Sequence, residues 1–594
     1  MSGSFGGLGL LAILGLMCGF VAGGVIILFR LFMDGAAAEF LPQNSIERFE
    51  DLAPMSRFLL CLGGGLAVGL FLHLLKPTTR IVGVVHVLER LDYHQGYLPI
   101  RNAVVQFISA SIALLTGQSV GREGPSIHLG ATAGSVLGRA LRIPNNSVRV
   151  MVGCGVAAAI AAAFNTPLAG VIFAMEVVIM DYSVIGFAPV IIAAVSATSL
   201  TRIVFGDQAS VVIPEFSIDA VREIPMMVIL GAVIGCISAA FIHITLLTSS
   251  LFAKQQIWLR ASIAGFLTGV IALFLPQVMG AGYDTINDLL WAQIGLSAVL
   301  LLTVAKLLTS ATAIGLGIPA GLIGPTLFIG AAAGAAIGSI ASIFAPVTVG
   351  TGFYAMLGMA AMMAATLQAP LAALIYLLEL TANHAIILPG MAAVISALLV
   401  TRVVFNKSSI YQHLMLSRGL DYRNTPASKT LRRIGVASVM DRDIVQQTRY
   451  LSREQANLLL QVKASPWLLL EANNEQKRSL LPVSDLALYL SQLDAQERAK
   501  ADLGINAMDA KTITIEGKTA EISHKKDQQI DLMAIPAKRL EAKPIGIIAT
   551  LQEAYEQMQL ESCEVLVVTG AHGATKERVY GVITKEHIER SYQP

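Results

Sequence analysis

The chain has 594 residues, of which 55% are hydrophobic and only 14% are charged, and its mean hydropathy is +0.66. Because a soluble globular protein carries about 25% charged residues, this composition argues against an ordinary soluble enzyme. The formal net charge of +2 provides no basic field, which argues against nucleic acid as a partner. Residues 1–405 hold 34 of the 82 Lys, Arg, Asp and Glu residues, whereas residues 406–594 hold 48. The sequence therefore predicts an apolar membrane body joined to a soluble tail.

Apolar stretches recur along the body. The first, Leu8 to Phe29, is long enough to span a bilayer. Similar stretches run from Phe58 to Leu75, Ile185 to Leu200, Met226 to Leu247, Ala261 to Leu275 and Ile386 to Val400. Four others are cut by glycine, proline or charge: Ala103 to Thr116, Ser126 to Leu141, Val152 to Ala163 and Pro167 to Met180. Helix ends inside the apolar layer need buried backbone or a water-filled cavity, so we expect an all-α polytopic body with broken helices.

The tail is predicted to alternate strands and helices. Thr425 to Arg433 is expected to be a polar linker. A first unit begins at Val436, with an apolar segment at Trp467 to Leu470, a helix at Leu481 to Leu493 and a charged connector from Asp494 to Lys526. A second unit has a helix at Leu551 to Leu560, strands at Val565 to Thr569 and Val579 to Ile583, and a closing helix from Lys585. This order predicts an α/β domain.

An internal repeat divides the body into halves of about residues 1–210 and 220–405. Three ordered matches carry it: Gly121-Arg-Glu-Gly-Pro125 with Gly321-Leu-Ile-Gly-Pro325, Pro167-Leu-Ala169 through Glu176 with Pro370-Leu-Ala372 through Glu379, and Thr201-Arg202 with Thr401-Arg402. Two homologous membrane halves indicate a transporter or channel whose site lies where the repeats meet.

Each Gly-x-x-Gly-Pro segment precedes a helical run of small residues. Proline suits the first turn of a helix, and glycine lets the backbone approach a ligand closely. The free amides and the positive end of the helix dipole attract an anion without a basic side chain. Close packing through Gly130, Gly134 and Gly138 is the alternative interpretation, and both roles are compatible.

Glu123 lies inside the first of these segments, where the second repeat has Ile323. An acid within a membrane is costly and is a functional candidate by default. A carboxylate is itself an anion, so it can occupy and block an anion site, and protonation would release it. Glu123 is therefore predicted to be a gate that responds to pH and to the anion. The alternative is a salt bridge with Arg122.

These two motifs, together with Ser409-Ile-Tyr411, resemble the CLC family of chloride channels and transporters over roughly residues 5–420. The resemblance implies a homodimer in which each subunit builds its own chloride pore from two inverted helical repeats. It implies residues 1–420 as the transmembrane anion pathway, in contact with the lipid bilayer. It also implies a multi-pass protein of a prokaryotic inner membrane, with residues 421–594 cytoplasmic.

The resemblance also assigns roles to individual residues. It implies that Glu123 is the external gating glutamate and that the Tyr411 hydroxyl contacts the central anion from the cytoplasmic side. The anions would face the segment around Arg122 and the backbone amides of four residues, Glu123, Gly124, Leu322 and Ile323.

Two departures from the family pattern affect the predicted function. Gly83-Val-Val-His-Val87 stands where the family has Gly-Ser-Gly-Ile-Pro, so Gly83 and Val84 occupy the first anion-binding segment without its serine. Val177 stands where proton-exchanging members often carry a second glutamate, and an apolar side chain cannot relay a proton. We therefore favour a voltage- and pH-sensitive chloride channel. The alternative is a chloride/proton antiporter, since some exchangers lack that glutamate.

The tail resembles a pair of cystathionine-beta-synthase-type (CBS) regulatory domains. In such domains a threonine or serine and an aspartate three residues later hold the ribose of an adenine nucleotide. Here Thr584 is followed by His587 and Ser484 by Ala487, so nucleotide binding is unsupported and a structural tail is favoured. The five cysteines are far apart, and no metal site or other cofactor is expected.

Two rival functions remain. Gly117-Gln-Ser-Val-Gly121 has the Gly-x-Ser-x-Gly pattern of a hydrolase nucleophile, but it runs between apolar helices into the anion motif rather than following a strand. We therefore do not expect an enzyme. The second rival is a membrane sensor whose tail binds a partner, and it would conduct no ions.

Overall fold

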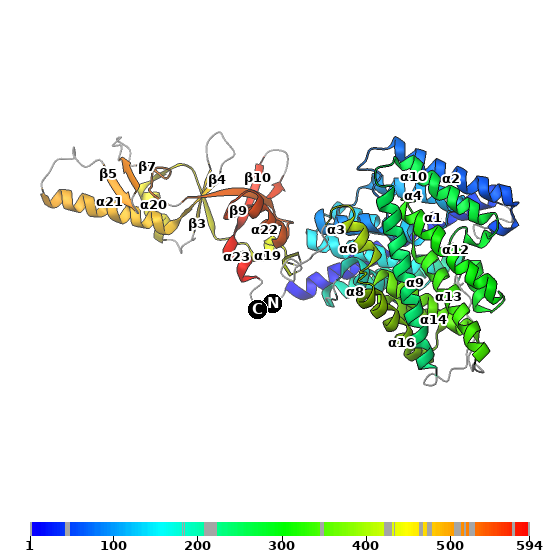
Figure 1. The fold of residues 1–594 in the computed structure, drawn as a ribbon. Coiled ribbons are helices and arrows are strands. Elements are labelled where there is room, and N and C mark those ends of the chain that lie inside the picture. The colour runs from blue at the N-terminus through cyan, green and yellow to red at the C-terminus, as the bar shows by residue number, and fades with distance from the viewer. Residues whose placement is uncertain are drawn as a thin grey trace. The chain divides into compact units, whose positions relative to one another are not determined.

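The structure is a computed structural model that describes residues 3–41, 48–180, 182, 184–206, 223–344, 350–420, 430–432, 434–461, 467–471, 478–503, 512–515, 518–521, 529–537, 539–572 and 576–591. The chain divides into two compact units, Met1–Arg142 with Ser147–Tyr422 and Ile143–Asn146 with Arg423–Pro594. The first unit is helical, and the second, which we call the tail, contains both strands and helices (Figure 1).

The first half of the helical unit runs from a long N-terminal helix to a helix that contains an internal proline. Its elements are α1 (Gly3–Phe40), η2 (Phe49–Asp51), α2 (Pro54–Leu74), α3 (Val84–Tyr93), α4 (Ile100–Leu115), α5 (Glu123–Ala140), α6 (Asn145–Phe164), α7 (Pro167–Phe173), the π-helical turn η3 (Ala174–Ile179) and α8 (Val184–Phe205).

The second half repeats this order with changes in length. Its elements are α9 (Ile224–Leu251), α10 (Ile257–Ala272), η4 (Pro276–Val278), α11 (Tyr283–Leu290), α12 (Leu296–Gly315), α13 (Ile323–Phe344), α14 (Thr351–Leu367), α15 (Pro370–Thr381), η5 (His384–Ile386), α16 (Ile387–Leu399), the π-helical turn η6 (Val400–Val404) and α17 (Ile410–Leu416).

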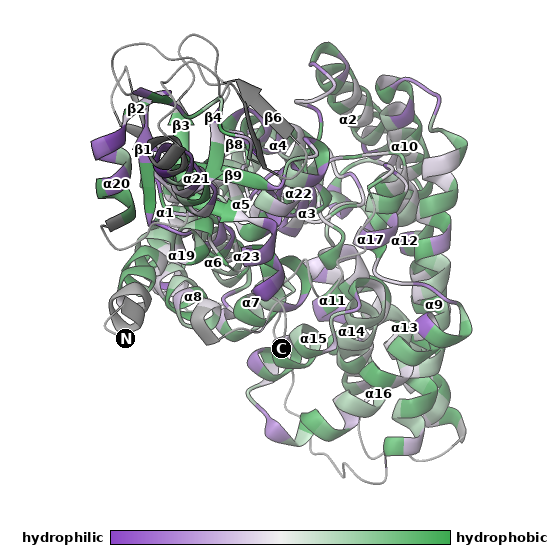
Figure 2. Cartoon of the chain, turned by 90° about the vertical axis from the view of Figure 1, so that its left-hand side faces the viewer, coloured by the Kyte–Doolittle hydropathy of each residue, from purple (hydrophilic) through white to green (hydrophobic). Residues whose placement is uncertain are grey.

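Within the described residues, eight helices are long and apolar enough to cross a membrane by their length and composition. Figure 2 shows hydrophobic residues over α9, α14 and α16, whereas α23 (Lys585–Arg590) in the tail is mainly hydrophilic. The polytopic helical architecture predicted from the sequence is therefore confirmed. The predicted break at Pro167 to Met180 is also present, because α7 has 7 residues and passes into η3.

One predicted interruption is wrong. Val152 to Ala163 lies within α6, a continuous helix of 20 residues. The glycines in this stretch do not end the helix, because they serve as contact points with α5. A Cβ atom on Gly155 would lie 2.0 Å from the Gly130 carbonyl oxygen, and the second half has the same close approach between Gly358 and Gly330, at 2.1 Å. Small residues that let backbones touch are the usual means of packing helices in a membrane.

The tail is built around a six-stranded sheet in the order β1-β3-β4-β8-β9-β10, with β1–β3 and β8–β9 parallel and the other neighbours antiparallel. Its strands are β1 (Ile444–Gln447), β3 (Trp467–Glu471), β4 (Arg478–Pro482), β8 (Leu540–Gly546), β9 (Val565–His572) and β10 (Lys576–Thr584). Two smaller antiparallel pairs are β2 (Tyr450–Ser452) with β7 (Gln529–Asp531) and β5 (Thr512–Ile515) with β6 (Lys518–Glu521).

The tail helices are α19 (Val436–Val439), α20 (Arg453–Gln461), α21 (Val483–Leu503), α22 (Leu551–Leu560) and α23. The predicted α/β character is confirmed, but the charged connector from Asp494 to Lys526 is wrong in part. Its first residues continue α21 to Leu503, and β5 and β6 pair within it. The predicted linker, Thr425 to Arg433, lies outside the described residues except at positions 430–432.

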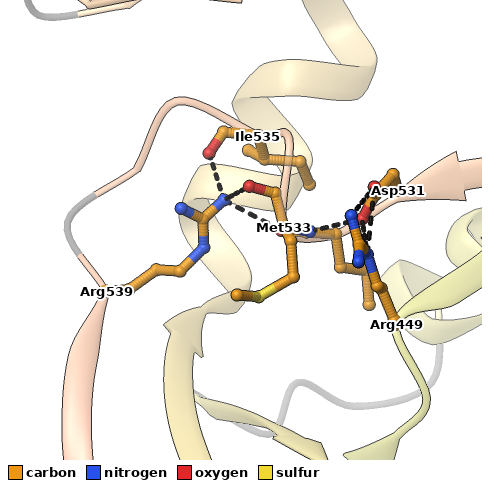
Figure 3. Close-up of polar contacts among 6 residues, drawn as sticks. Arg449, Asp531, Met533, Ile535 and Arg539 are labelled. Carbon is orange, nitrogen blue, oxygen red and sulfur yellow. Dashed lines mark hydrogen bonds and ion pairs between the residues drawn. The ribbon is translucent and has the colours of Figure 1, made fainter. Parts of the chain in front are cut away.

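Hydrogen bonds and an ion pair stabilise the segment that follows β7 (Figure 3). Arg449 donates hydrogen bonds to both carboxylate oxygens of Asp531, the shortest at 2.8 Å. Asp531 also accepts the backbone amide of Met533 at 2.9 Å. Arg539 donates to the carbonyl oxygens of Met533 and Ile535, both at 2.6 Å. These contacts close the turn between β7 and β8.

Candidate functional site

The two glycine-proline segments meet through their backbones. The Gly121 amide donates to the Gly321 carbonyl oxygen, and the Gly321 amide donates to the Gly121 carbonyl oxygen, both at 2.7 Å in an antiparallel bridge. Because equivalent residues of the two repeats exchange these bonds, a local two-fold axis relates the halves at this point. We call this contact the glycine bridge. It places the beginnings of α5 and α13 side by side.

The first turns of α5 and α13 present amides that a helix cannot satisfy. Glu123 and Gly124 belong to the first turn of α5, and Ile323 opens α13 directly after Leu322. The first amides of a helix have no carbonyl partner within it, and the helix dipole adds partial positive charge there. A Cβ atom on Gly124 would lie 2.8 Å from Gly321 Cα, so only glycine allows the two helix ends to approach this closely.

The Glu123 side chain folds back over the glycine bridge and is completely buried. Cβ atoms on Gly121 and Gly321 would lie 2.0 and 2.7 Å from Glu123 Oε2, so both glycines leave room for this carboxylate. Glu123 Oε1 accepts a hydrogen bond from the Tyr283 hydroxyl. Glu123 Oε2 is buried and has no hydrogen-bond partner among the described residues. A carboxyl group therefore already lies where the beginnings of the two helices meet.

Tyr283 was not identified from the sequence, and neither was the lysine that holds its loop. Tyr283 is the first residue of α11 and follows Gly282, which has a φ of +80°. The Lys306 ammonium is fully buried and donates to the carbonyl oxygens of Val278 and Gly280, at 3.0 and 2.8 Å. Lys306 thus fixes the loop that delivers Tyr283 to Glu123. The signal for Lys306 was available, since it is the one charged residue in the apolar helix α12.

Two cavities lie near Glu123. The smaller, about 50 Å³, is lined by Tyr283, Arg122 and Ser126, and we call it the tyrosine cavity. The Arg122 guanidinium lies 5.4 Å from the centre of the Tyr283 ring. The larger cavity has a volume of about 340 Å³, and we call it the arginine cavity. Three arginines, Arg80, Arg260 and Arg418, line it, and its described lining contains no acidic residue. A cavity of one charge sign concentrates ions of the opposite sign, here anions.

The arginine cavity brings together four of the residues singled out in the sequence. Its lining includes Gly83, Val84, Leu322 and Tyr411. Val84 opens α3 after Gly83, which has a φ of +85°, so the lining has an apolar side chain at that point and no serine hydroxyl. Tyr411 is buried in α17 with 4% of its surface exposed. These four residues come from three separate stretches of the chain.

Glu123 lies close to residues that belong to both cavities. Tyr283, which donates to its carboxylate, lines the tyrosine cavity. Gly321, on which a Cβ atom would lie 2.7 Å from the other oxygen, comes directly before Leu322, which lines the arginine cavity. The carboxylate therefore lies close to a residue that lines the tyrosine cavity and to the segment that lines the arginine cavity.

Glu176 and Glu379, which the repeat pairs with each other, bind backbone amides reciprocally. Each carboxylate accepts two amides at the start of the other repeat's helix: Glu176 those of Leu371 and Ala372 at 3.2 and 2.7 Å, and Glu379 those of Leu168 and Ala169 at 2.8 and 2.7 Å. The two glutamates therefore share a structural role that links the repeats. Val177, the next residue, lies buried in η3, which packs against α3.

The remaining candidates lie in other settings. Ser119 of the Gly-x-Ser-x-Gly pattern lies 2.8 Å from the Ser310 hydroxyl and accepts from the Thr309 hydroxyl at 3.0 Å, so it joins the repeats just before the glycine bridge. In the tail, the Thr584 hydroxyl accepts the His587 amide at 3.3 Å and caps α23. The Ser484 hydroxyl lies 3.4 Å from a carboxylate oxygen of Asp485.

Comparison with known proteins gives consistent results. Residues 64–402 match the family model described as voltage gated chloride channel. A ClcB-like protein of Ralstonia nicotianae is 31% identical over 383 residues, which cover 63% of this chain and 89% of the relative. The H(+)/Cl(−) exchange transporter ClcA of Vibrio cholerae is 30% identical over 362 residues, which cover 59% of this chain and 76% of the relative.

Solved structures share the fold at lower sequence identity. A slow cyanobacterial Cl−/H+ antiporter has a TM-score of 0.59 and 22% identity, and the match covers 70% of this chain and 99% of that chain. A eukaryotic CLC transporter has a TM-score of 0.56 and 17% identity, and the match covers 97% of each chain.

Proposed function

Because the chain belongs to the voltage-gated chloride channel family, we propose that it moves chloride across a membrane in exchange for protons, with Glu123 as the gate. One observation carries this proposal. The Glu123 carboxylate lies on the glycine bridge, buried, at the point where α5 and α13 begin. A negatively charged oxygen there stands in for the anion that the two helix ends would otherwise bind.

The proposed gating follows from competition for one site. Chloride would enter the arginine cavity, drawn by its three arginines, and would reach the amides at the starts of α5 and α13. The ionised Glu123 carboxylate lies beside the same helix starts and repels a second anion there. Protonation removes its charge and lets chloride take its place. One carboxylate thus handles both a proton and a competing anion.

Exchange and passive conduction differ in whether a proton must cross for chloride to cross. The sequence favoured a passive channel, because Val177 removes the second acid. The Vibrio cholerae relative, named as an H(+)/Cl(−) exchange transporter at 30% identity, supports exchange better, and we adopt it. A passive, voltage-sensitive chloride channel is the second candidate, and Val177 is the observation that favours it.

We also propose how the molecule is organised. The family resemblance supports a homodimer with one pore per subunit, in a prokaryotic inner membrane with the tail in the cytoplasm.

The alternation of strands and helices supports a CBS-type pair in the tail. We propose that this pair is structural and binds no adenine nucleotide, because Thr584 already caps α23 and His587 stands in place of the acid. Addition of ATP is then expected to leave the melting temperature of the purified protein unchanged.

The proposed exchange is tested by reversal potentials in planar bilayers with a fixed chloride gradient, with and without a pH gradient. Exchange predicts that the reversal potential shifts with the pH gradient. A potential that follows chloride alone would contradict exchange and support the channel. Absence of chloride current would contradict chloride transport and favour the sensor.

Glu123→Gln keeps the shape of the side chain but cannot titrate, so it should abolish the pH shift while chloride still crosses. Glu223→Gln is a matched control, since Glu223 is a buried acid held by the Tyr354 hydroxyl at 2.8 Å.

A further inference from the structure

Two buried histidines form a hydrogen-bonded pair that the gating of Glu123 does not use. His86 lies on α3 and His128 on α5, and neither ring is exposed. His86 Nδ1 lies 2.8 Å from His128 Nε2, and the ring centres are 5.1 Å apart. Burying two imidazoles in an apolar body is costly unless their nitrogens have partners. The pair therefore calls for a role beyond packing.

The hydrogen bonds fix which nitrogen carries each proton. Arg90 Nε donates to His86 Nε2 at 3.0 Å, and an arginine cannot accept, so His86 Nε2 is the acceptor. The proton of His86 then lies on Nδ1 and is donated to His128 Nε2. The proton of His128 is left on Nδ1, which is buried without a hydrogen-bond partner among the described residues. Arg90 and His86 thus donate in one direction, and the N–H of His128 at the end has no acceptor among the described residues.

This chain of donors connects α3, which begins at a residue of the arginine cavity, with α5, which carries Glu123. His86 follows Val84 by two residues, and Val84 lines the arginine cavity. His128 lies five residues after Glu123 on the same helix. The helix that carries His86, α3, packs against α5 and against η3, which contains Val177. The pair is therefore close to the element in which a proton-carrying acid is missing.

Charged groups around the pair are held by other partners or are repelled by a protonated ring. On and near α3, Arg90, His94 and Arg418 oppose a positive charge on His86, and Glu89 lies 3.9 Å from His94. Glu176 of η3 accepts backbone amides of α15. Arg149 of α6 donates to the Leu91 carbonyl oxygen.

Glu123 is the one acid of helix α5. On the other elements packed against α5, Arg30 and Asp34 of α1 form an ion pair with each other at 3.8 Å, and Arg101 of α4 is exposed. Glu123 is therefore the nearest acid in sequence that could exchange a proton with His128.

We propose that His86 and His128 relay the protons that cross during exchange, in place of the acid that Val177 replaces. A proton that binds His86 Nε2 displaces the Arg90 hydrogen bond. The proton on His86 Nδ1 then passes to His128 Nε2, and the proton on His128 Nδ1 leaves toward Glu123. One proton enters and one leaves, and only N–H bonds form or break. The relay rests on the proposed exchange function.

The test uses glutamine, which preserves both hydrogen bonds but cannot relay a proton. In His86→Gln the amide oxygen accepts from Arg90 and the amide N–H donates to His128; in His128→Gln the oxygen accepts from His86. Chloride and proton fluxes are measured together in liposomes that contain the full-length chain. His243→Gln, at an exposed position on α9, is the matched control.

We expect both variants to lower the ratio of proton flux to chloride flux at least tenfold, with chloride flux retained and the control unchanged. An unchanged ratio in both variants, with wild-type exchange intact, would overturn the relay alone. Wild-type protein that moves chloride but no protons would overturn exchange and the relay together. Equal loss of both fluxes in both variants, with unaltered melting temperature, would assign the pair to positioning α3 against α5 and would also overturn the relay.

Discussion

The Tyr283 hydroxyl donates a hydrogen bond to the buried carboxylate of Glu123, across 160 residues of sequence. This bond holds the carboxylate on the glycine bridge, and it is strongest when Glu123 is ionised. Tyr283 therefore acts as a positioning residue that favours the blocked state of the site.

Tyr283→Phe removes this hydrogen bond and keeps the ring. A hydrogen bond to a charged group contributes about 1.5–3 kcal/mol, so the equilibrium between blocked and open states should shift roughly tenfold to a hundredfold toward open. Chloride efflux from liposomes at neutral pH should rise accordingly and depend less on acidification. Tyr354→Phe is the control, since it removes a tyrosine–glutamate hydrogen bond elsewhere in the body. A Tyr283→Phe efflux equal to that of the control would contradict the positioning role.

Lys306→Met should lower stability and disturb the gate together. The substitution leaves the buried carbonyl oxygens of Val278 and Gly280 without their donor, and each unsatisfied group costs about 1–3 kcal/mol. Thermal unfolding in detergent should therefore occur at lower temperature, and efflux should resemble that of Tyr283→Phe. Lys254→Met, at an exposed position, should change neither property. Normal efflux from Lys306→Met would show that the loop holds Tyr283 without the lysine.

Glu176→Ala and Glu379→Ala should be equally destabilising, because each removes the acceptor of two amides in the opposite repeat. Each substitution leaves two donors unsatisfied, so we expect a loss of about 2–6 kcal/mol from the free energy of unfolding. The glutamine variants retain one good acceptor oxygen and should lose less. Melting temperatures of the four variants check this order. A large effect from one glutamate alone would contradict the reciprocal arrangement.

The fold of the body was largely predictable, and the site was predictable in part. The repeat and the glycine-proline motifs placed Glu123 and the starts of α5 and α13, because these features depend on local backbone chemistry. Tyr283 and Lys306 were missed because their roles arise only when a loop of the second half packs on a helix start of the first. The continuous helix α6 was missed because glycine is unfavourable inside an isolated helix, whereas in α6 it permits close contact with another helix.

Acid should loosen the turn after β7 in the tail. Burial acts to raise the pKa of Asp531, but the hydrogen bonds from Arg449 and the Met533 amide outweigh it, so this pKa lies below its ordinary value. A carboxylate with a lowered pKa stabilises the fold above its unfolded pKa of about 3.9, and the contribution is lost as pH falls through the folded pKa.

Hydrogen exchange of residues 529–535, corrected for the intrinsic pH dependence, should stay slow at neutral pH and accelerate at low pH. Arg449→Gln removes the charged donor and should move this acceleration to higher pH. The same profile in both proteins would show that Arg449 does not set the pKa of Asp531.

The glycine bridge has a consequence for how the protein is made. Gly121 leaves the ribosome about 200 residues before its partner Gly321. The amides of Leu168 and Ala169 are likewise made 211 and 210 residues before Glu379, which accepts them. Until the second half is inserted, the amide and carbonyl of Gly121 and the first amides of α7 lack their partners, and unpaired backbone groups are costly within a bilayer. A stalled or truncated chain is thus a natural substrate for membrane quality control. The anion site is one of the last features to exist in a newly synthesised molecule.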